Sequence, residues 1–310
     1  MRILVSGGAG FIGSHTVDAL VAAGGHEVSI IDSLSAGKRE QVNPRARFHQ
    51  ADLCDAAAVR ATFERERPEI LVHLAAQMDV RRSVADPAFD AQVNLIGFLN
   101  LMEAGRANGL RRVVFSSTGG AIYGEQDIFP CNEDHPQRPV SPYGVAKLAT
   151  EKYLFFYKVQ YGIDYAAMRY SNVYGPRQDP HGEAGVVAIF CGRILEDRPV
   201  TIYGDGKQTR DYVFVGDVVR ANVAAVASAV SGPFNIGTGI ETDVNQLYAT
   251  LAKGAGASRA PEYGPARPGE QMRSVILPAR AEKELGWRPQ VELSEGLAQT
   301  LRYFREPASH

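Results

Sequence analysis

Short apolar runs alternate with longer amphipathic stretches through the first half of the chain. The pattern predicts strands at Ile3–Val5, Val28–Ile31, Ile70–Ala75 and Arg112–Ser116, and helices at Phe11–Ala23 and Asp90–Asn108. Short apolar strands separated by helices are typical of a parallel sheet that is covered on both faces. Right-handed crossovers make such a sheet doubly wound. We therefore expect an α/β fold with a Rossmann-type sheet.

The composition is that of a globular protein with a full apolar core, since 45% of the 310 residues are hydrophobic and 22% are charged. The formal net charge of −2 disfavours DNA, RNA and anionic membranes as partners. The opening MRILVSGG is too short an apolar run for a signal peptide, and no run is long enough to cross a membrane. Cys54, Cys131 and Cys191 lack the spacing of metal ligands, so we expect reduced thiols, no metal site and a cytoplasmic location.

Three glycines follow the first predicted strand and open the first helix. Gly7, Gly10 and Gly13 are spaced G-x-x-G-x-x-G. Glycine at such positions permits a tight turn, close approach of the backbone to a pyrophosphate, and close packing of helix on strand. The N–H groups of the helix N-terminus then point at the phosphates. A Gly-rich string alone could be a plain turn, but its position between strand and helix favours a dinucleotide site.

Asp32 ends the second strand, about twenty residues further on, where a carboxylate can accept both ribose hydroxyls of the cofactor. This favours NAD over NADP, although Arg39 is near enough in the sequence to leave NADP open. Asp52 and Leu53 follow the next predicted strand and could meet the adenine ring. A solvated loop is an equally good interpretation of Asp52.

Tyr143 and Lys147 stand at i and i+4, so a helix places them on one face. A nearby ammonium favours the phenolate, which predicts that Lys147 lowers the pKa of Tyr143 and makes it a usable base. A surface helix pair is the alternative for this motif taken alone. The hydroxyl residues Ser116, Ser117 and Thr118 end a predicted strand, where open α/β sheets bind ligands.

Together these residues resemble the extended short-chain dehydrogenase/reductase family of NAD-dependent epimerases and dehydratases. Further segments carry the resemblance over nearly the whole chain: Leu74–Ala76, Asn94, Ile122–Glu125, Arg169–Pro176, Ile202–Gly206, Arg210–Tyr212 and Arg267–Glu270. The likeness is strongest to the family's UDP-hexose 4-epimerases. It implies interconversion of UDP-glucose and UDP-galactose, in which NAD removes and returns a hydride at sugar C4 through a 4-keto sugar.

The resemblance also implies a role for each matching residue. Tyr143 would be the acid/base, Lys147 would support it, and Thr118 would bond the sugar hydroxyl. The implied cofactor contacts are Gly7, Gly10, Phe11, Ile12, Gly13, Asp32, Ser33, Asp52, Leu53, Leu74, Ala75, Ala76, Asn94, Ser116, Tyr143, Lys147 and Tyr170. The implied UDP-sugar contacts are Thr118, Tyr143, Asn172, Arg210, Arg267, Glu270 and Ser274. Arginine suits the diphosphate because guanidinium binds phosphate oxygens in pairs and stays charged.

Two departures from the family pattern bear on the reaction. The stretch from Thr118 to Tyr123 has one residue more than is usual, so Thr118 is the preferred catalytic hydroxyl and Ser117 the alternative. Dehydratases of the family carry an acidic residue after the strand-end threonine, where this chain has Gly119 and Gly120. The dehydratase reaction is therefore disfavoured.

Ser274 stands where a bulky tyrosine restricts some family members to plain hexoses. Its small side chain predicts that UDP-GlcNAc and UDP-GalNAc also fit, unless Ser274 is a loop residue outside the pocket. A 4-ketosugar reductase, a UDP-uronate 4-epimerase and a catalytically silent NAD-binding protein remain as alternatives. The family often pairs two long helices across a dimer, so we expect a homodimer.

Beyond about Gly175 the regular pattern gives way to Pro, Gly and Asp clusters, which are typical of substrate-binding segments. We expect an NAD-binding domain at residues 1–174 and a smaller, irregular UDP-sugar domain at 175–310. Val213–Val219 and Phe234–Ile236 resemble buried strands. Parts of residues 213–240 are therefore expected to return to the first sheet.

Overall fold

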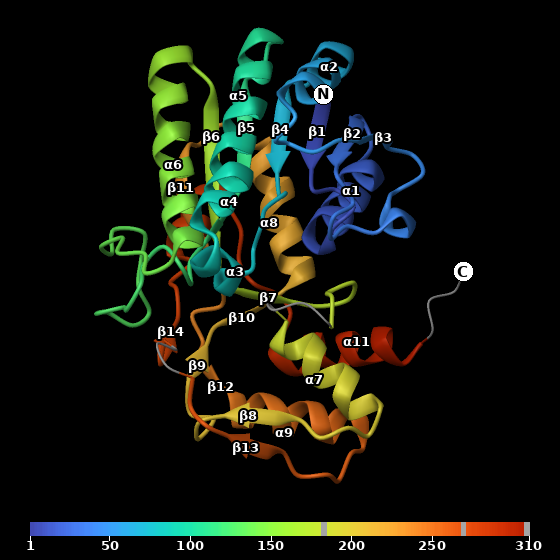
Figure 1. The fold of residues 1–310 in the computed structure, drawn as a ribbon, viewed down its shortest axis with the longest axis vertical. Coiled ribbons are helices and arrows are strands. Elements are labelled where there is room, and N and C mark those ends of the chain that lie inside the picture. The colour runs from blue at the N-terminus through green and yellow to red at the C-terminus, as the bar shows by residue number, and fades with distance from the viewer. Residues whose placement is uncertain (181–184, 268–270, 307–310) are drawn as a thin grey trace.

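The computed structural model describes residues 1–180, 185–267 and 271–306, and Figure 1 shows their arrangement. The elements of the sheet region are β1 (Arg2–Ser6), α1 (Phe11–Ala23), β2 (Glu27–Asp32), η1 (Arg39–Gln41), β3 (Arg47–Gln50), α2 (Ala56–Glu66), β4 (Ile70–His73), α3 (Val80–Ala85), α4 (Pro87–Ala91), η2 (Gln92–Ile96), α5 (Gly97–Ala107), β5 (Arg112–Thr118), α6 (Pro142–Tyr161), β6 (Asp164–Tyr170), α8 (Val215–Ala227), β11 (Gly232–Ile236) and α10 (Ala279–Leu285). The remaining elements are β7 (Asn172–Tyr174), α7 (Val186–Leu195), β8 (Thr201–Tyr203), β9 (Thr209–Arg210), β10 (Tyr212–Phe214), β12 (Thr242–Asp243), α9 (Val244–Ala255), β13 (Glu262–Gly264), β14 (Arg273–Ser274) and α11 (Leu293–Arg305).

Among the described residues, seven parallel strands form the central sheet in the order β11-β6-β5-β4-β1-β2-β3. The chain moves outward from β1 in one direction through β2 and β3, and in the other through β4, β5 and β6. The strand order therefore reverses between β1 and β4. Open α/β sheets bind ligands in the crevice beyond the carboxyl ends of the strands at such a reversal. The predicted Rossmann-type sheet is confirmed.

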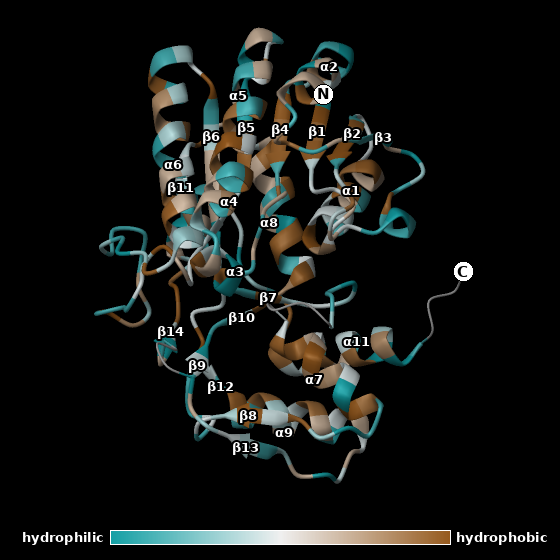
Figure 2. Cartoon of the chain, viewed as in Figure 1, coloured by the Kyte–Doolittle hydropathy of each residue, from teal (hydrophilic) through white to brown (hydrophobic). Residues whose placement is uncertain are grey.

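The strands are apolar on both faces because helices cover both. Ile3 and Val5 of β1 pack into a core with α1 and α8, whereas Leu4 between them packs into a second core with α2 and α5. Alternate residues of a strand point to opposite faces, so a continuous apolar run is required. Figure 2 shows β1, β2 and β4 largely in brown.

The remaining elements form a smaller group below the sheet in Figure 1. Helices α7, α9 and α11 share an apolar core there, which includes Val187, Leu251 and Leu301. Three small sheets join this group: β12-β9-β14, β13-β8 and the pair β10-β7. Short strands and loops thus lie against the carboxyl edge of the large sheet.

The chain crosses back to the large sheet after residue 213. Phe234–Ile236 lies in β11 and pairs with β6, as the sequence led us to expect. The expected strand at Val213–Val219 is wrong, because β10 ends at Phe214 and α8 begins at Val215. Helix α8 still returns to the sheet, since Val218 and Ala225 pack into the core beside α1.

No helix within residues 1–180, 185–267 and 271–306 is long and apolar enough to cross a membrane. The thiols of Cys54, Cys131 and Cys191 are free, and the last two are buried.

Candidate functional site

The Gly-rich loop is held where only glycine fits. Gly7 has φ +73°, and a Cβ on it would lie 2.6 Å from the backbone nitrogen of Ala75. A Cβ on Gly13 would lie 1.9 Å from the carbonyl oxygen of Gly7, so α1 packs directly on the loop. Gly10 caps α1 without a side-chain hydrogen bond, which leaves the first N–H groups of the helix for a ligand. Glycine thus lets the loop pack tightly on Ala75 and α1, and the free N–H groups of the helix suit a dinucleotide pyrophosphate.

Asp32 stands at the end of β2 and is only 8% exposed. Its carboxylate accepts hydrogen bonds from the backbone nitrogens of Ala9 (3.0 Å) and Leu34 (2.8 Å). These bonds fix the carboxylate beside the Gly-rich loop, where it can meet the ribose of a dinucleotide. Arg39 kept NADP as an alternative cofactor in the sequence analysis. Its guanidinium stacks 4.2 Å from the ring centre of Phe48. Asp52 is exposed, and its side chain accepts a hydrogen bond from the backbone nitrogen of Cys54.

The loop after β4 closes the other side of this crevice. Leu74, Ala75 and Ala76 are partly buried there. Asn94 lies in η2, a π-helical turn, and its amide nitrogen donates to the carbonyl oxygen of Gln77 at 2.9 Å. A single π-helical turn within a longer helix occurs often at functional sites. The structure thus brings Asn94 to the segment that faces the glycines.

Helix α6 carries Tyr143 and Lys147 on the side that faces β5. Ser141 caps the helix by accepting a hydrogen bond from the backbone nitrogen of Gly144, and Pro142 occupies its first turn. Both residues suit a helix N-terminus. The Nζ of Lys147 lies 5.7 Å from the ring centre of Tyr143 and donates to the carbonyl oxygen of Ser116 at 2.7 Å. Lys147 therefore meets the end of β5, and Tyr143 lies next to Lys147.

The pKa of Tyr143 moves opposite to the predicted direction. Burial raises the pKa of the phenol above its usual range, and the charge of Asp90 adds to the rise. Burial also lowers the pKa of Lys147 to about 7, which Asp90 partly opposes. In the chain by itself burial thus sets the direction of the pKa shift, and a lowering of the Tyr143 pKa by Lys147 stays a prediction. An enclosed phenolate would be poorly solvated, and this outweighs an ammonium at such a distance.

Strand geometry separates the two candidate hydroxyls. Ser117 is 2% exposed and points to the face that α6 covers, where its hydroxyl donates to Glu151 at 2.6 Å. Successive side chains of a strand point to opposite faces, so Thr118 lies on the other face. The Thr118 hydroxyl accepts a hydrogen bond from the backbone nitrogen of Ala121 at 3.2 Å. A Cβ on Gly144 would lie 2.7 Å from the carbonyl oxygen of Ala121, so this turn reaches the start of α6.

The sequence did not reveal the ion pair that anchors α6 to the sheet. Arg169 of β6 is 1% exposed and donates to both carboxylate oxygens of Glu151, at 3.0 and 2.7 Å. It also donates to the hydroxyl of Tyr123 at 2.9 Å, which in turn donates to Asn235. A paired guanidinium and carboxylate with these added bonds can remain charged inside a protein. The only available signal was that Glu151 follows Lys147 at i+4.

The two glycines that take the place of the dehydratase acid differ in their surroundings. A Cβ on Gly119 would lie 2.7 Å from the side chain of Ile276. Gly120 is open, and the nearest atom to a Cβ there is the Thr118 hydroxyl at 3.9 Å. Only the second position therefore has room for a longer side chain, and the chain has none there.

The predicted substrate residues lie below the carboxyl edge of the sheet. Arg210 of β9 is partly buried and stands directly opposite Ser274 of β14 in parallel register. Ser274 is 4% exposed, so it is a strand residue and not part of a free loop. Asn172 begins β7, and its backbone nitrogen donates to the carbonyl oxygen of Asp211.

Two further predicted residues have contacts outside these strands. Arg267 is exposed and stacks 3.9 Å from the ring centre of Tyr203, so it borders the β13-β8 sheet and not the strand of Arg210. Tyr170, expected to border the nicotinamide, is 5% exposed and donates its hydroxyl to Asn222 of α8 at 2.6 Å. Glu270 lies outside the described residues.

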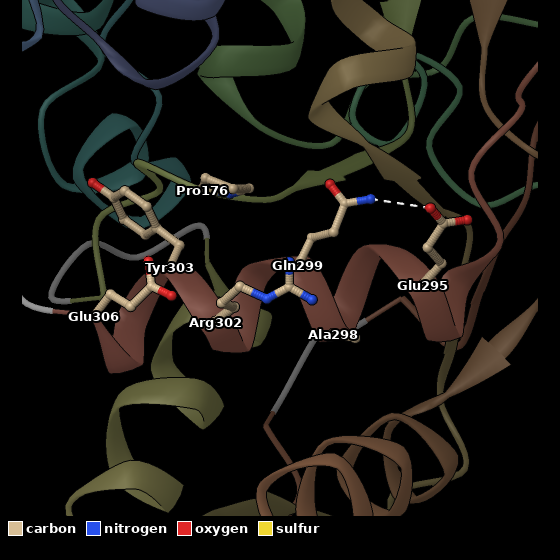
Figure 3. Close-up of a pocket in the computed structure, with 7 residues that line it drawn as sticks. All are labelled: Pro176, Glu295, Ala298, Gln299, Arg302, Tyr303 and Glu306. Atoms are coloured by element: carbon tan, nitrogen blue, oxygen red, sulfur yellow. Dashed lines mark hydrogen bonds between the residues drawn. The ribbon is translucent and has the colours of Figure 1, made fainter.

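A separate groove of about 430 Å³ runs along α11 and is shown in Figure 3. Its lining residues are Pro176, Glu295, Ala298, Gln299, Arg302, Tyr303 and Glu306. None of the predicted site residues that the structure describes lines it, so we do not count it as part of the candidate site. Within the described part of the chain, no group of three or more His, Cys, Asp or Glu side chains could hold a metal ion.

Residues 3–237 match the NAD dependent epimerase/dehydratase family. The chain belongs to this family. A UDP-glucose 4-epimerase of Mycolicibacterium smegmatis is 48% identical over 98% of this chain and 99% of its own length. The UDP-glucose 4-epimerase of Thermotoga maritima, solved with UDP-glucose, superposes with a TM-score of 0.96 at 50% identity, covering 98% of this chain and 99% of that one. The UDP-glucose 4-epimerase of Thermus thermophilus, solved with NAD, superposes with a TM-score of 0.93 at 48% identity, covering 98% of this chain and 99% of that one. This epimerase/dehydratase family member thus shares its whole architecture with such enzymes.

Proposed function

We propose that this protein is a UDP-glucose 4-epimerase that interconverts UDP-glucose and UDP-galactose with NAD as its cofactor. The observation that carries the proposal is that Lys147 bonds the end of β5 and lies beside Tyr143, at the same edge of the sheet as a loop whose Gly7 and Gly13 tolerate no Cβ. The close relatives and solved structures of this family support the same reaction.

The glycine cradle, the free N-terminus of α1 and the carboxylate of Asp32 would hold the dinucleotide. NAD, when bound, supplies a cationic ring that takes and returns the hydride of sugar C4 and that favours the phenolate of Tyr143. Tyr143 accepts the proton of the C4 hydroxyl and later gives it back. Thr118 bonds the same oxygen, and Lys147 holds positive charge beside the phenol.

Substrate binding at the diphosphate leaves the sugar ring free. Arg210 and Arg267 would hold the phosphates, where guanidinium binds oxygen in pairs. A 4-keto sugar anchored only through its nucleotide can rotate and present its other face. Binding energy from the remote UDP thus positions the reacting carbon without fixing one face of the hexose.

The test of this function is the Tyr143→Phe variant, assayed with UDP-galactose in a coupled reaction. Removing the phenol oxygen should leave NAD and UDP binding intact and lower kcat by about 10²–10⁴-fold. Near-normal turnover would rule out Tyr143 as the base. A 4-ketosugar reductase would instead consume added NADH in proportion to product, and a uronate epimerase would prefer UDP-glucuronate.

We also infer that a second copy of this chain covers the outer face of α6. Phe155, Phe156 and Val159 are 58%, 45% and 69% exposed along this helix. Neighbouring apolar side chains left exposed on a helix mark an interaction surface. In sedimentation, the protein should have twice its chain mass of 33.6 kDa. The double variant Phe155→Glu/Val159→Glu should sediment with half that mass, as a single chain. Val140→Glu changes an exposed loop residue and should leave the sedimenting mass unchanged.

A further inference from the structure

A buried carboxylate lies near Tyr143 and Lys147 and takes no part in the proposed reaction. Asp90 of α4 is 1% exposed. Its Oδ1 accepts hydrogen bonds from the amide nitrogens of Asn94 (2.9 Å) and Gln77 (3.0 Å). Its Oδ2 is also buried and has no hydrogen-bond partner among the described residues. A carboxylate oxygen in such a position is costly unless a positive charge offsets it.

The matching positive charge is that of Lys147. Helix α4 packs against α6 (Figure 1), and the charge of Asp90 acts on both Tyr143 and Lys147. Lys147 is 3% exposed. Its Nζ donates to the Ser116 carbonyl, and no carboxylate forms a salt bridge with it in the part of the chain that the structure describes. A buried ammonium and a buried carboxylate thus share one environment, each without a direct ionic partner.

We propose that Asp90 is the counter-charge of Lys147 and shifts its side chain toward the ammonium form, which makes Asp90 a positioning residue of the site. The inference rests on the proposed roles of Tyr143 and Lys147. An opposite charge nearby favours the charged form of a buried group. Through Asn94 and Gln77, the same carboxylate also holds the π-helical turn against the loop after β4.

The other groups around Lys147 do not supply this charge. His73 of β4 stacks on Phe115, and burial together with Lys147 lowers its pKa to about 3, so it is neutral near pH 7. Glu151 on the same helix is paired with Arg169. Tyr143 is neutral because its pKa is raised.

The charged side chains of α3 and of its N-cap have interactions of their own. Asp79 caps this helix by accepting from the backbone nitrogen of Arg82. Arg82 itself stacks 4.0 Å from the ring centre of Phe89 on α4. Arg81 also interacts with a group of its own. The segment Gln92–Ile96 carries no titratable side chain. Asp90 is therefore the group whose removal should change the charge of Lys147.

The test is the Asp90→Asn variant, which keeps an oxygen acceptor for Gln77 and Asn94 and removes only the charge. The chain has seven lysines, so ¹³Cε-lysine NMR of the NAD-saturated protein can follow each one, with Lys147→Met assigning the signal. Asp90→Asn should move the Lys147 titration midpoint down by about one pH unit or more. Glu64→Gln, at an exposed acid of α2, should leave it in place.

An unchanged Lys147 midpoint in Asp90→Asn would overturn the inference. If that variant does not fold, Asp90→Ser removes the same charge and carries the same expectation. The turnover of Tyr143→Phe and Lys147→Met is measured separately. Full activity of Tyr143→Phe and Lys147→Met would refute the proposed catalytic pair, whatever the Lys147 midpoint is in Asp90→Asn. If these two variants are inactive and the Lys147 midpoint does not move in Asp90→Asn, only the role of Asp90 is refuted.

Discussion

The hydroxyl of Ser117 donates to Glu151 at 2.6 Å, and this bond directs it into the core between β5 and α6. Thr118, its neighbour, points to the opposite face and bonds the turn that leads toward Tyr143. The two hydroxyls are adjacent in the sequence but have different surroundings. Thr118 is therefore our choice for the catalytic hydroxyl.

Replacing each hydroxyl should separate their roles. Thr118→Val should lower kcat by about 10²-fold or more with little change in thermal stability, because it removes a bond to the reacting oxygen. Ser117→Ala should keep kcat within a few-fold but lower the free energy of unfolding by about 1–3 kcal/mol, since buried Glu151 loses a donor. Steady-state kinetics and urea unfolding measure the two effects. The reverse pattern would assign catalysis to Ser117.

Arg169 should matter for stability far more than an ion pair at the surface. Arg169→Met leaves the buried Glu151 carboxylate unpaired, which should cost about 3–5 kcal/mol of unfolding free energy. Arg177 pairs with Asp18 at 2.8 Å, and their side chains are 27% and 36% exposed. Arg177→Met should therefore cost about 0–1 kcal/mol. Equal losses in denaturant titrations would contradict a special role for the buried pair.

The buried Lys147 should make stability depend on pH in a definite direction. Its pKa in the folded chain is lowered to about 7, against 10.5 for the free side chain. Between these values the unfolded chain binds more protons, so the unfolding free energy should rise with pH. Lys147→Met should lack this rise, which amounts to at most about 1.4 kcal/mol per pH unit. If the unfolding free energies of the native protein and of Lys147→Met change in parallel from pH 7 to 9, a buried lysine with a lowered pKa is contradicted.

Ser274 should set the size of the accepted sugar. It is buried beside Arg210 in adjacent strands, so a larger side chain there would fill space next to the proposed diphosphate site. Ser274→Tyr should abolish turnover of UDP-N-acetylglucosamine and keep that of UDP-glucose. Ser274→Ala serves as the control and should keep both. If the native enzyme turns over UDP-glucose alone, the predicted breadth is wrong.

Most of the large sheet could be predicted from the sequence. Helix α1 has the bounds that the periodicity gave, Phe11–Ala23, and β1, β2 and β5 lie at the expected apolar runs. Such features depend on residues that are neighbours in the chain. The expectation for Val213–Val219 is wrong because short apolar runs, here on either side of Gly216 and Asp217, occur both in buried strands and in buried helices, so periodicity cannot separate them.

The candidate site divides in the same way. The spacing of the glycines and of Tyr143 and Lys147 could be read directly, because a turn and one helix face are local features. The sequence alone could not show that Asp90 or Arg169 belongs beside them. Each is brought to α6 by the packing of a different element.

The sequence by itself thus determined the strand and helix pattern, the glycine cradle and the face that carries the catalytic pair. Only the tertiary structure decided that Glu151 engages the Ser117 hydroxyl and not that of Thr118, and which carboxylates accompany Lys147 and Arg169. It also decided that the pKa of Tyr143 rises. The physical reason is that burial and charge at a point sum over every element packed around it, and those elements lie far apart along the chain.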